Sequence, residues 1–248
     1  MPRLVHCVWL IAILWPVGLW LAGWQALHAE PAASRWHAVL VAGDTAEPVF
    51  DNAVDAFARW LGDRGVPSAD IHRLSASQQQ RDSTIEPASA ENILQRIASL
   101  RPQPGERCLI FITSHGQRGE GIWLAYSGDY LRPASLARAL SAGCAAVPSV
   151  VILSSCYSGA FTRGAMRAPN RVILSAARPD RPSFGCQADR TYTVFDECLL
   201  AALPRAPTWR AVYTSSLRCV QARERALHVL PSQPQGSFGA RVRDLAVR

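Results

Sequence analysis

The sequence predicts an α/β fold in which helices cover both faces of a mostly parallel central sheet, giving a three-layer sandwich. Two observations support this prediction. Short runs rich in Val, Ile and Leu alternate with helical segments along the chain, the pattern of a parallel sheet covered on both faces. The chain has 248 residues, 49% of them apolar, which is enough for one substantial core and gives no sign of a second globular domain.

The expected elements alternate in order along the chain. Strands are expected over residues 36–42, 71–74, 108–113, 150–153 and 171–175, and helices over residues 52–61, 90–100, 133–141, 195–203 and 209–225. Ser89 and Thr208 directly precede two of these helices and are expected to cap them. Residues 121–126 are expected to add a short hairpin, and residues 75–87, with three consecutive glutamines, to form a surface loop.

Two of the expected strands end in residues that can carry nucleophilic catalysis. The apolar run before His115 leads into Thr-Ser-His-Gly, and the run before Cys156 leads into Ser-Ser-Cys-Tyr-Ser-Gly. Functional groups gather at the carboxyl ends of strands in open parallel sheets. The chain between the two residues is long enough for one crossover helix. The sequence therefore predicts that His115 and Cys156 converge at one edge of the sheet.

The chemistry of these residue types fits acyl transfer. The thiolate is the attacking form of cysteine, and a nearby imidazole promotes its formation at neutral pH. Gly116 follows His115, and a glycine lets its backbone N–H come close to a reacting carbonyl oxygen. The backbone N–H groups of Gly116 and Cys156 are therefore the candidate oxyanion donors.

Several segments around these residues resemble a known family. SHG and SCYSG, followed by VILSAARPDRPSFGC, are similar to the legumain family of caspase-like cysteine peptidases, in particular its bacterial members. WHAVLVAGD with PVFDNAVDAF near the start, and PSQPQGSFGARV near the end, extend the likeness over residues 36–242. The resemblance implies a caspase-like fold and an endopeptidase with Cys156 as nucleophile and His115 as general acid and base.

The chain also departs from the family pattern. Animal and plant legumains place Asn and then Arg after the first strand, where this chain reads Val-Phe-Asp-Asn over residues 49–52. They place Glu two positions before the nucleophile, where this chain has Ser154. The asparagine specificity of legumain therefore does not carry over.

The resemblance suggests three residues for the substrate pocket. Asp51 and Asp196 correspond to places where the family builds its pocket, and Ser175 resembles a pocket-lining residue. Two carboxylates would favour a basic substrate side chain. Asp51 is also expected as an alternative cap of the first helix, and Asp196 has Glu197 as its neighbour in an unsettled register.

Composition excludes several mechanisms. The 26 basic residues outnumber 19 acidic ones, and all 26 are arginine, so Schiff-base chemistry, Ser-Lys dyads and P-loop phosphate binding lack their lysine. No GxSxG, HExxH or CxxC motif occurs, so we expect no metal and no cofactor. No aromatic interleaving accompanies the arginine clusters, and we expect no nucleic acid partner.

The amino-terminal segment is expected to direct the chain out of the cytoplasm. Residues 5–29 contain no Asp, Glu, Lys or Arg and follow Arg3, and a span of about 20 apolar residues can cross a bilayer. We expect residues 1–29 to be a signal or membrane anchor, and residues 36–248 to be the peptidase domain in the cell envelope. Whether the segment is cleaved stays open, as does the number of copies that assemble.

Export would allow disulfides among the six cysteines beyond Cys7. If Cys156 is the free nucleophile, five remain and form at most two bridges. Cys198 with Cys219 is the first candidate pair.

Two other functions remain open from the sequence. If an amine, in place of water, attacked the thioester that Cys156 forms with the substrate, the pair of Cys156 and His115 would act as a peptide ligase. A non-catalytic envelope module that binds peptide would instead hold Cys156 in a disulfide.

Overall fold

The computed structural model of the chain describes residues 1–2, 35–77 and 84–247. Residues 33–248 form one compact unit, and the expected signal or anchor segment lies outside the described residues except for its first two. Within the described ranges, no helix is long and apolar enough to span a membrane.

The elements follow one another as the alternating pattern predicts. Their order is β1 (Trp36–Ala42), α1 (Val49–Gly62), β2 (Ile71–Ser75), β3 (Ile85–Pro87), α2 (Ala90–Ala98), β4 (Arg107–Thr113), β5 (Gly116–Gln117), β6 (Gly121–Leu124), β7 (Asp129–Leu131), α3 (Pro133–Gly143), β8 (Ser149–Ser154), β9 (Arg171–Ser175), α4 (Val194–Ala202), α5 (Trp209–Ala226) and β10 (Gln235–Phe238). Short 3₁₀ turns cover Ser68–Asp70, Ser158–Thr162 and Gly164–Met166.

The central sheet has seven strands in the order β10-β9-β8-β4-β1-β2-β3. All neighbouring pairs are parallel except β10 with β9. Strands β2 and β3 are added on one side of β1, and β4, β8 and β9 are added on its other side. The direction in which successive strands are added therefore reverses at β1. Functional sites in such sheets lie where the order reverses, at the carboxyl ends of the strands.

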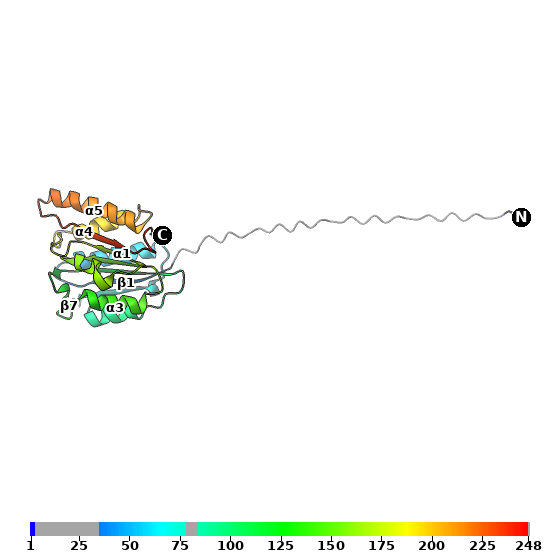
Figure 1. Cartoon of the computed structure of the whole chain (residues 1–248), viewed down its shortest axis with the longest axis horizontal. Helices are drawn as coiled ribbons and strands as arrows, with labels where there is room; N and C mark the ends of the chain where they lie inside the picture. The colour runs from blue at the N-terminus through cyan, green and yellow to red at the C-terminus, as the bar shows by residue number, and fades with distance from the viewer. Residues whose placement is uncertain (3–34, 78–83, 248) are drawn as a thin grey trace. The chain divides into compact units, whose positions relative to one another are not determined.

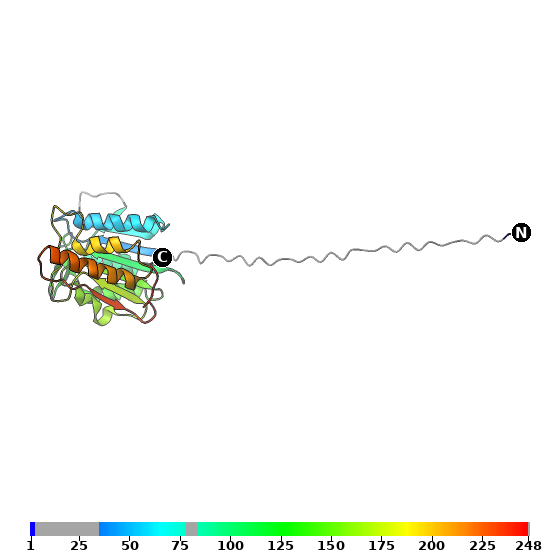
Figure 2. The same ribbon diagram turned by 90° about the horizontal axis from the view of Figure 1, so that it is seen from above.

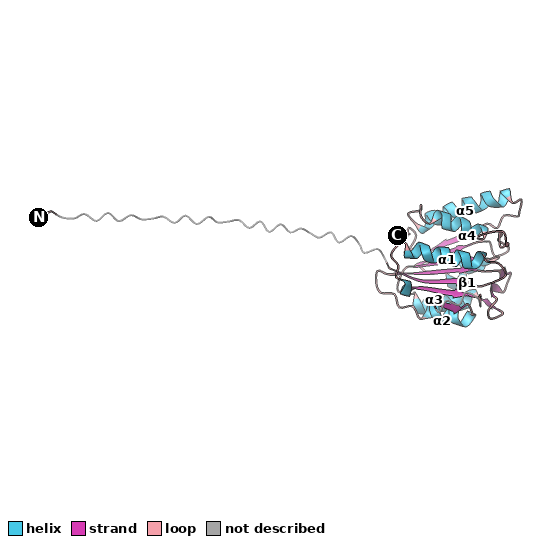
Figure 3. Cartoon of the chain, turned by 180° about the vertical axis from the view of Figure 1, so that it is seen from behind, coloured by secondary structure: helices cyan, strands magenta, loops and turns pink. Residues whose placement is uncertain are grey.

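Helices cover both faces of the sheet. Helices α1, α4 and α5 lie on one face, as Figures 1 and 2 show, and α2 and α3 lie on the other (Figure 3). In β1, Leu40 packs into the core under α1, α4 and α5, while Val39 and Val41 pack into the second core under α2 and α3. Because side chains alternate across a strand, both faces of β1 are apolar and the strand reads as one continuous hydrophobic run.

The α/β class and the mostly parallel sheet are confirmed, and two edge strands are additional. Residues 75–87, expected as a loop, contain β3, and β10 was not expected. Each of these strands pairs with one neighbour only, and β3 ends in Pro87, a residue tolerated at sheet edges. Their short, polar or proline-containing sequences lack the apolar run that marks the inner strands.

Candidate active site

His115 and Cys156 follow adjacent strands of the sheet. Strands β4 and β8 are parallel neighbours whose last residues, Thr113 and Ser154, are direct Cα partners. The Ser114 N–H donates to the Ser154 carbonyl at 3.1 Å and continues the pairing one residue further. His115 and Cys156 each stand two positions beyond these partners. The segments that follow β4 and β8 therefore leave the sheet next to each other, at the carboxyl ends of the strands.

Gly116 brings the two loops into direct contact. A Cβ atom placed on Gly116 would lie 2.3 Å from the carbonyl oxygen of Cys156 and 3.0 Å from Ser155 Oγ. No residue with a side chain fits at that distance. The backbone that follows His115 therefore rests against the backbone of the cysteine, as expected for a glycine chosen for close approach. Its role as an oxyanion donor stays a prediction.

The side chain of Phe50, which was not predicted as a site residue, packs against His115. The ring of Phe50, at the start of α1, meets the imidazole edge to face with centroids 5.3 Å apart. The Trp123 N–H donates to the His115 carbonyl at 3.0 Å and fixes the backbone through the β5–β6 hairpin. Within residues 35–77 and 84–247, no side chain is hydrogen-bonded to the imidazole, which leaves Phe50 as its orienting contact.

The thiol of Cys156 is free and partly exposed. The N–H of Ser183 points at Sγ from 3.3 Å, and the Ser183 hydroxyl lies 3.7 Å from it. An N–H that faces sulfur stabilises the negative charge of a thiolate. Tyr157 then turns the chain with a φ of 59°, an uncommon value for a residue with a side chain, and its N–H donates to the Arg181 carbonyl at 2.9 Å.

The loop after β9 lies against the cysteine turn. A Cβ on Gly159 would lie 2.7 Å from the Ala177 carbonyl and 2.6 Å from the Pro179 side chain. Cys186, at the far end of this loop, is a second free thiol. Burial raises its pKa most, and Cys156 with the carboxylates of Glu47 and Asp44 raises it further. Ser183 and Cys186 belong to the segment that carries the family resemblance, but their contacts were not predicted.

The three expected pocket residues are buried. Asp51 lies in the first turn of α1 with 8% of its surface exposed and accepts a bond from Ser75 Oγ at 2.8 Å. Ser175 is 0% exposed, and its hydroxyl donates to the Ala177 carbonyl at 3.2 Å. Asp196 is also 0% exposed. Their place in the substrate pocket stays a prediction.

The electrostatics of these carboxylates follow from their burial. Desolvation raises the pKa of Asp51, and the Ser75 hydroxyl partly offsets that rise. Desolvation also raises the pKa of Asp196, to about 6. The register of α4 is now settled, because Asp196 faces inward while Glu197 pairs with arginines at the surface.

Four cysteines form two disulfides. The expected pair of Cys198 with Cys219 is confirmed and joins α4 to α5. Cys108 in β4 pairs with Cys144 at the end of α3. Because Cys156 takes part in neither bond, the module in which this cysteine is disulfide-bonded finds no support here.

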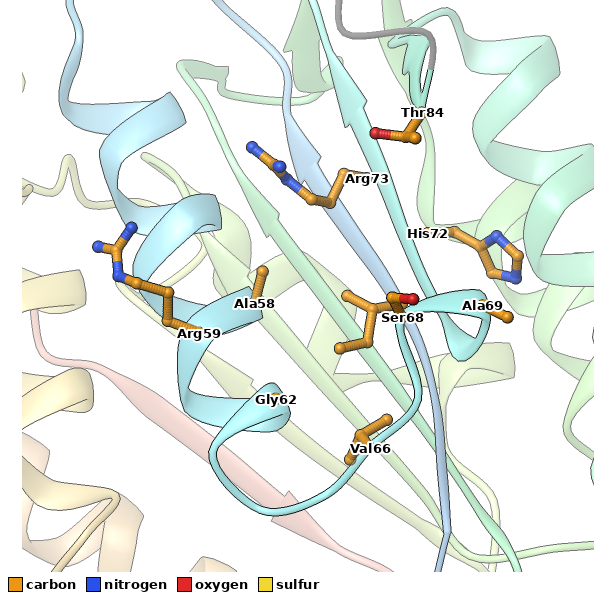
Figure 4. Close-up of a pocket in the computed structure, with 10 residues that line it drawn as sticks. Ala58, Arg59, Gly62, Val66, Ser68, Ala69, His72, Arg73 and Thr84 are labelled. Atoms are coloured by element: carbon orange, nitrogen blue, oxygen red, sulfur yellow. The ribbon is translucent and has the colours of Figure 1, made fainter.

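A cavity of about 600 Å³ lies away from the dyad. It opens between the carboxyl end of α1 and the amino end of β2 (Figure 4), lined by Ala58, Arg59, Gly62, Val66, Ser68, Ala69, Ile71, His72, Arg73 and Thr84. Among the residues that the structure describes, no cluster of three His, Cys, Asp or Glu side chains could hold a metal ion. His115 and Cys156 lie at the other end of the strands, beyond the carboxyl ends of β4 and β8.

Comparison with known proteins bears on the family and the fold. Residues 89–206 match the model of the Peptidase C13 family, the legumain family, and this match confirms the resemblance. The fold is similar to that of caspase-1 from Spodoptera frugiperda, with a TM-score of 0.55 at 16% identity over 83% of this chain and 86% of that one. The caspase-like fold is confirmed. A comparison with curated protein sequences gives no match.

Proposed function

We propose that this chain, a Peptidase C13 family member over residues 89–206 with a caspase-like fold, is a cysteine endopeptidase. The family and the fold support a function of the cysteine-peptidase type. The observation that carries the finer proposal is the contact of Gly116 with the Cys156 backbone. This contact joins the loop of His115 to Cys156, whose thiol is free, partly exposed and faced by the Ser183 N–H.

In the proposed reaction, Cys156 Sγ attacks the carbonyl carbon of the scissile peptide bond. His115 takes the thiol proton, and the N–H groups of Gly116 and Cys156 donate to the oxyanion of the tetrahedral intermediate. His115 then gives the proton to the leaving amine as the C–N bond breaks, leaving a thioester. Water attacks the thioester, its proton passes to His115 and on to Sγ, and the free carboxylic acid product leaves.

The substrate would bind across the mouth formed by the loops after β1, β4 and β9. Ser183, by its contacts with Sγ, would keep the thiol oriented before a peptide arrives. An oriented thiol favours peptide cleavage, because reacting groups that are already held in place lose less entropy on reaching the transition state.

A peptide library tests the proposal. The full chain should cleave library peptides at internal bonds, and the new carboxyl ends, read by mass spectrometry, should identify the residue before each cut. Iodoacetamide should block cleavage by alkylating Cys156, and the Cys186→Ser variant, which lacks the second free thiol, should be blocked equally. Cleavage that survives complete alkylation of Cys156 would rule out the thiol mechanism.

We also propose that the enzyme acts in the cell envelope, membrane-anchored or released there. The uncharged residues 5–29 support this location, and the two disulfides support it independently, since disulfides persist in oxidising compartments.

A further inference from the structure

Asp196 is a carboxyl group buried below the dyad. It lies in the first turn of α4 with 0% of its surface exposed, and Thr193 caps the helix by accepting the Asp196 N–H at 3.1 Å. Its Oδ1 atom has no hydrogen-bond partner among the described residues. Carboxylates are rarely buried without a paired charge, so this position calls for an explanation.

Asp196 gathers hydroxyls from the two strands that carry the dyad. Thr113 Oγ1, on the last residue of β4, donates to Asp196 Oδ2 at 2.8 Å. The hydroxyl of Ser154, on the last residue of β8, lies 3.4 Å from Thr193 Oγ1, the atom that accepts the Asp196 N–H. Thr113 and Ser154 are Cα partners in the sheet. Asp196 therefore ties the ends of both strands to the start of α4, with its carboxyl group bonded to β4 and its backbone N–H linked to β8 through Thr193.

Stability does not explain why this group is a carboxyl. Burial raises its pKa to about 6, and the surrounding hydroxyls of Ser154, Thr113 and Thr193 only partly offset that rise. Within residues 35–77 and 84–247 no basic side chain forms an ion pair with Asp196, because Arg190 and Arg223 pair with Glu197 instead. An amide of the same size would avoid this cost, but it would present one acceptor oxygen and a donor NH2 group in place of two acceptor oxygens. Groups kept against stability cluster at functional sites.

We infer that Asp196 is a positioning residue of the peptidase. Its carboxylate holds the end of β4 through Thr113, and its backbone N–H holds the end of β8 through Thr193 and Ser154, in the spacing that His115 and Cys156 need. The inference rests on the proposed function. Each strand end lies two residues from a member of the dyad, so a change in the hydroxyl bonds of Thr113 or Ser154 moves that member directly. Catalytic groups displaced by about 1 Å lose roughly 100-fold in rate.

The protonation of Asp196 should make activity depend on pH. A protonated carboxyl must donate one hydrogen bond and loses an acceptor, so the bond from Thr113 is weakened as pH falls through about 6. Activity that depends on Asp196 should fall there too. Stability moves in the opposite direction. The raised pKa means that the folded chain binds more protons than the unfolded chain between about 4 and 6, so this group's contribution to stability declines as pH rises across that window.

The test compares Asp196→Asn with a matched buried carboxylate. Asp70, 7% exposed at the amino end of β2, is paired with Arg35, which lowers its pKa. Asp196→Asn should unfold at or above the wild-type temperature at pH 7.5, lose about tenfold or more in kcat, keep KM within about twofold, and lack the fall in activity near pH 6. Asp70→Asn should do the reverse, with lower stability and unchanged kcat/KM.

Thr113 provides a second route to the same answer if Asp196→Asn does not fold. Thr113→Val removes the donor with little change in volume and should lower kcat, and Thr113→Ser, which keeps the hydroxyl, should recover most of it. Wild-type kcat and an unchanged pH profile in Asp196→Asn, or equal kcat in the Val and Ser variants, would overturn the inference. Cleavage by Cys156→Ala would instead overturn the proposed function, so the two failures are distinguishable.

Discussion

Replacing Gly116 with Ala should separate the loop that carries His115 from the loop that carries Cys156. The added Cβ would lie 2.3 Å from the Cys156 carbonyl oxygen, whereas ordinary contacts begin near 3.4 Å. The loops must therefore part by about 1 Å, because the obstructing atom belongs to backbone and cannot rotate away. A misplacement of about 1 Å between reacting groups costs roughly 100-fold in rate, equivalent to about 2.7 kcal/mol of activation free energy.

The fold should tolerate this change better than the activity does. Overpacking costs about 1–3 kcal/mol, which lowers the unfolding temperature of a chain of this size by roughly 2–4 °C per kcal/mol. The assay is kcat/KM on a peptide that the enzyme cleaves, measured beside thermal unfolding followed by circular dichroism. We expect Gly116→Ala to unfold cooperatively and to lose about two orders of magnitude in kcat/KM.

Gly62→Ala is the matched control. Gly62 ends α1, and a Cβ placed there meets no atom within 4 Å. Alanine should therefore raise stability by roughly 0.5–1 kcal/mol and leave kcat/KM unchanged. If Gly116→Ala also kept wild-type kcat/KM, the contact between the two loops would have no part in catalysis, and the reasoning from their close approach would be refuted.

Three further changes have outcomes that follow from the structure. Replacing Cys198 and Cys219 with Ala opens a loop of 21 residues and should lower the free energy of unfolding in urea by about 3 kcal/mol; no loss would argue against the pairing. Asp51→Asn should leave the preferred substrate residue unchanged, because the Asp51 carboxyl group is buried and bonded to Ser75; a loss of basic substrates alone would support its place in the pocket. Because burial raises the pKa of Asp51, the variant should also gain stability over wild type in thermal unfolding as pH rises above 3.8. Full-length protein should fractionate with the cell envelope, and its recovery in the cytosolic fraction would contradict the role given to residues 5–29.

The inner sheet could be predicted from the sequence because its strands are buried on both faces. The observed bounds of β1 and β9 coincide with the expected residues 36–42 and 171–175. The edge strands carry no such run. Gln235–Phe238 contains Gln, Gly and Ser, so its pairing with β9 depends on a neighbour far away in the sequence and not on its own composition.

The candidate site also combines residues that the sequence predicts with residues that it does not. Cys156 and His115 each follow an apolar strand, a local signal that the sequence displays. Phe50, Ser183 and the role of Asp196 depend on contacts that no local pattern encodes. The bond from Thr113 to Asp196, for example, spans 83 positions. The burial of Asp196 could not be read from a sequence in which an acidic neighbour, Glu197, occupies the next position.

The central claim is that Cys156 and His115 act as one catalytic unit. The most direct measurement is cleavage of a defined peptide by Cys156→Ala and His115→Ala, each compared with wild type at equal concentration and with circular dichroism to establish folding. The account predicts that both variants fold and that both lose cleavage, because either substitution removes activation of the nucleophile. Wild-type turnover by folded Cys156→Ala would contradict it.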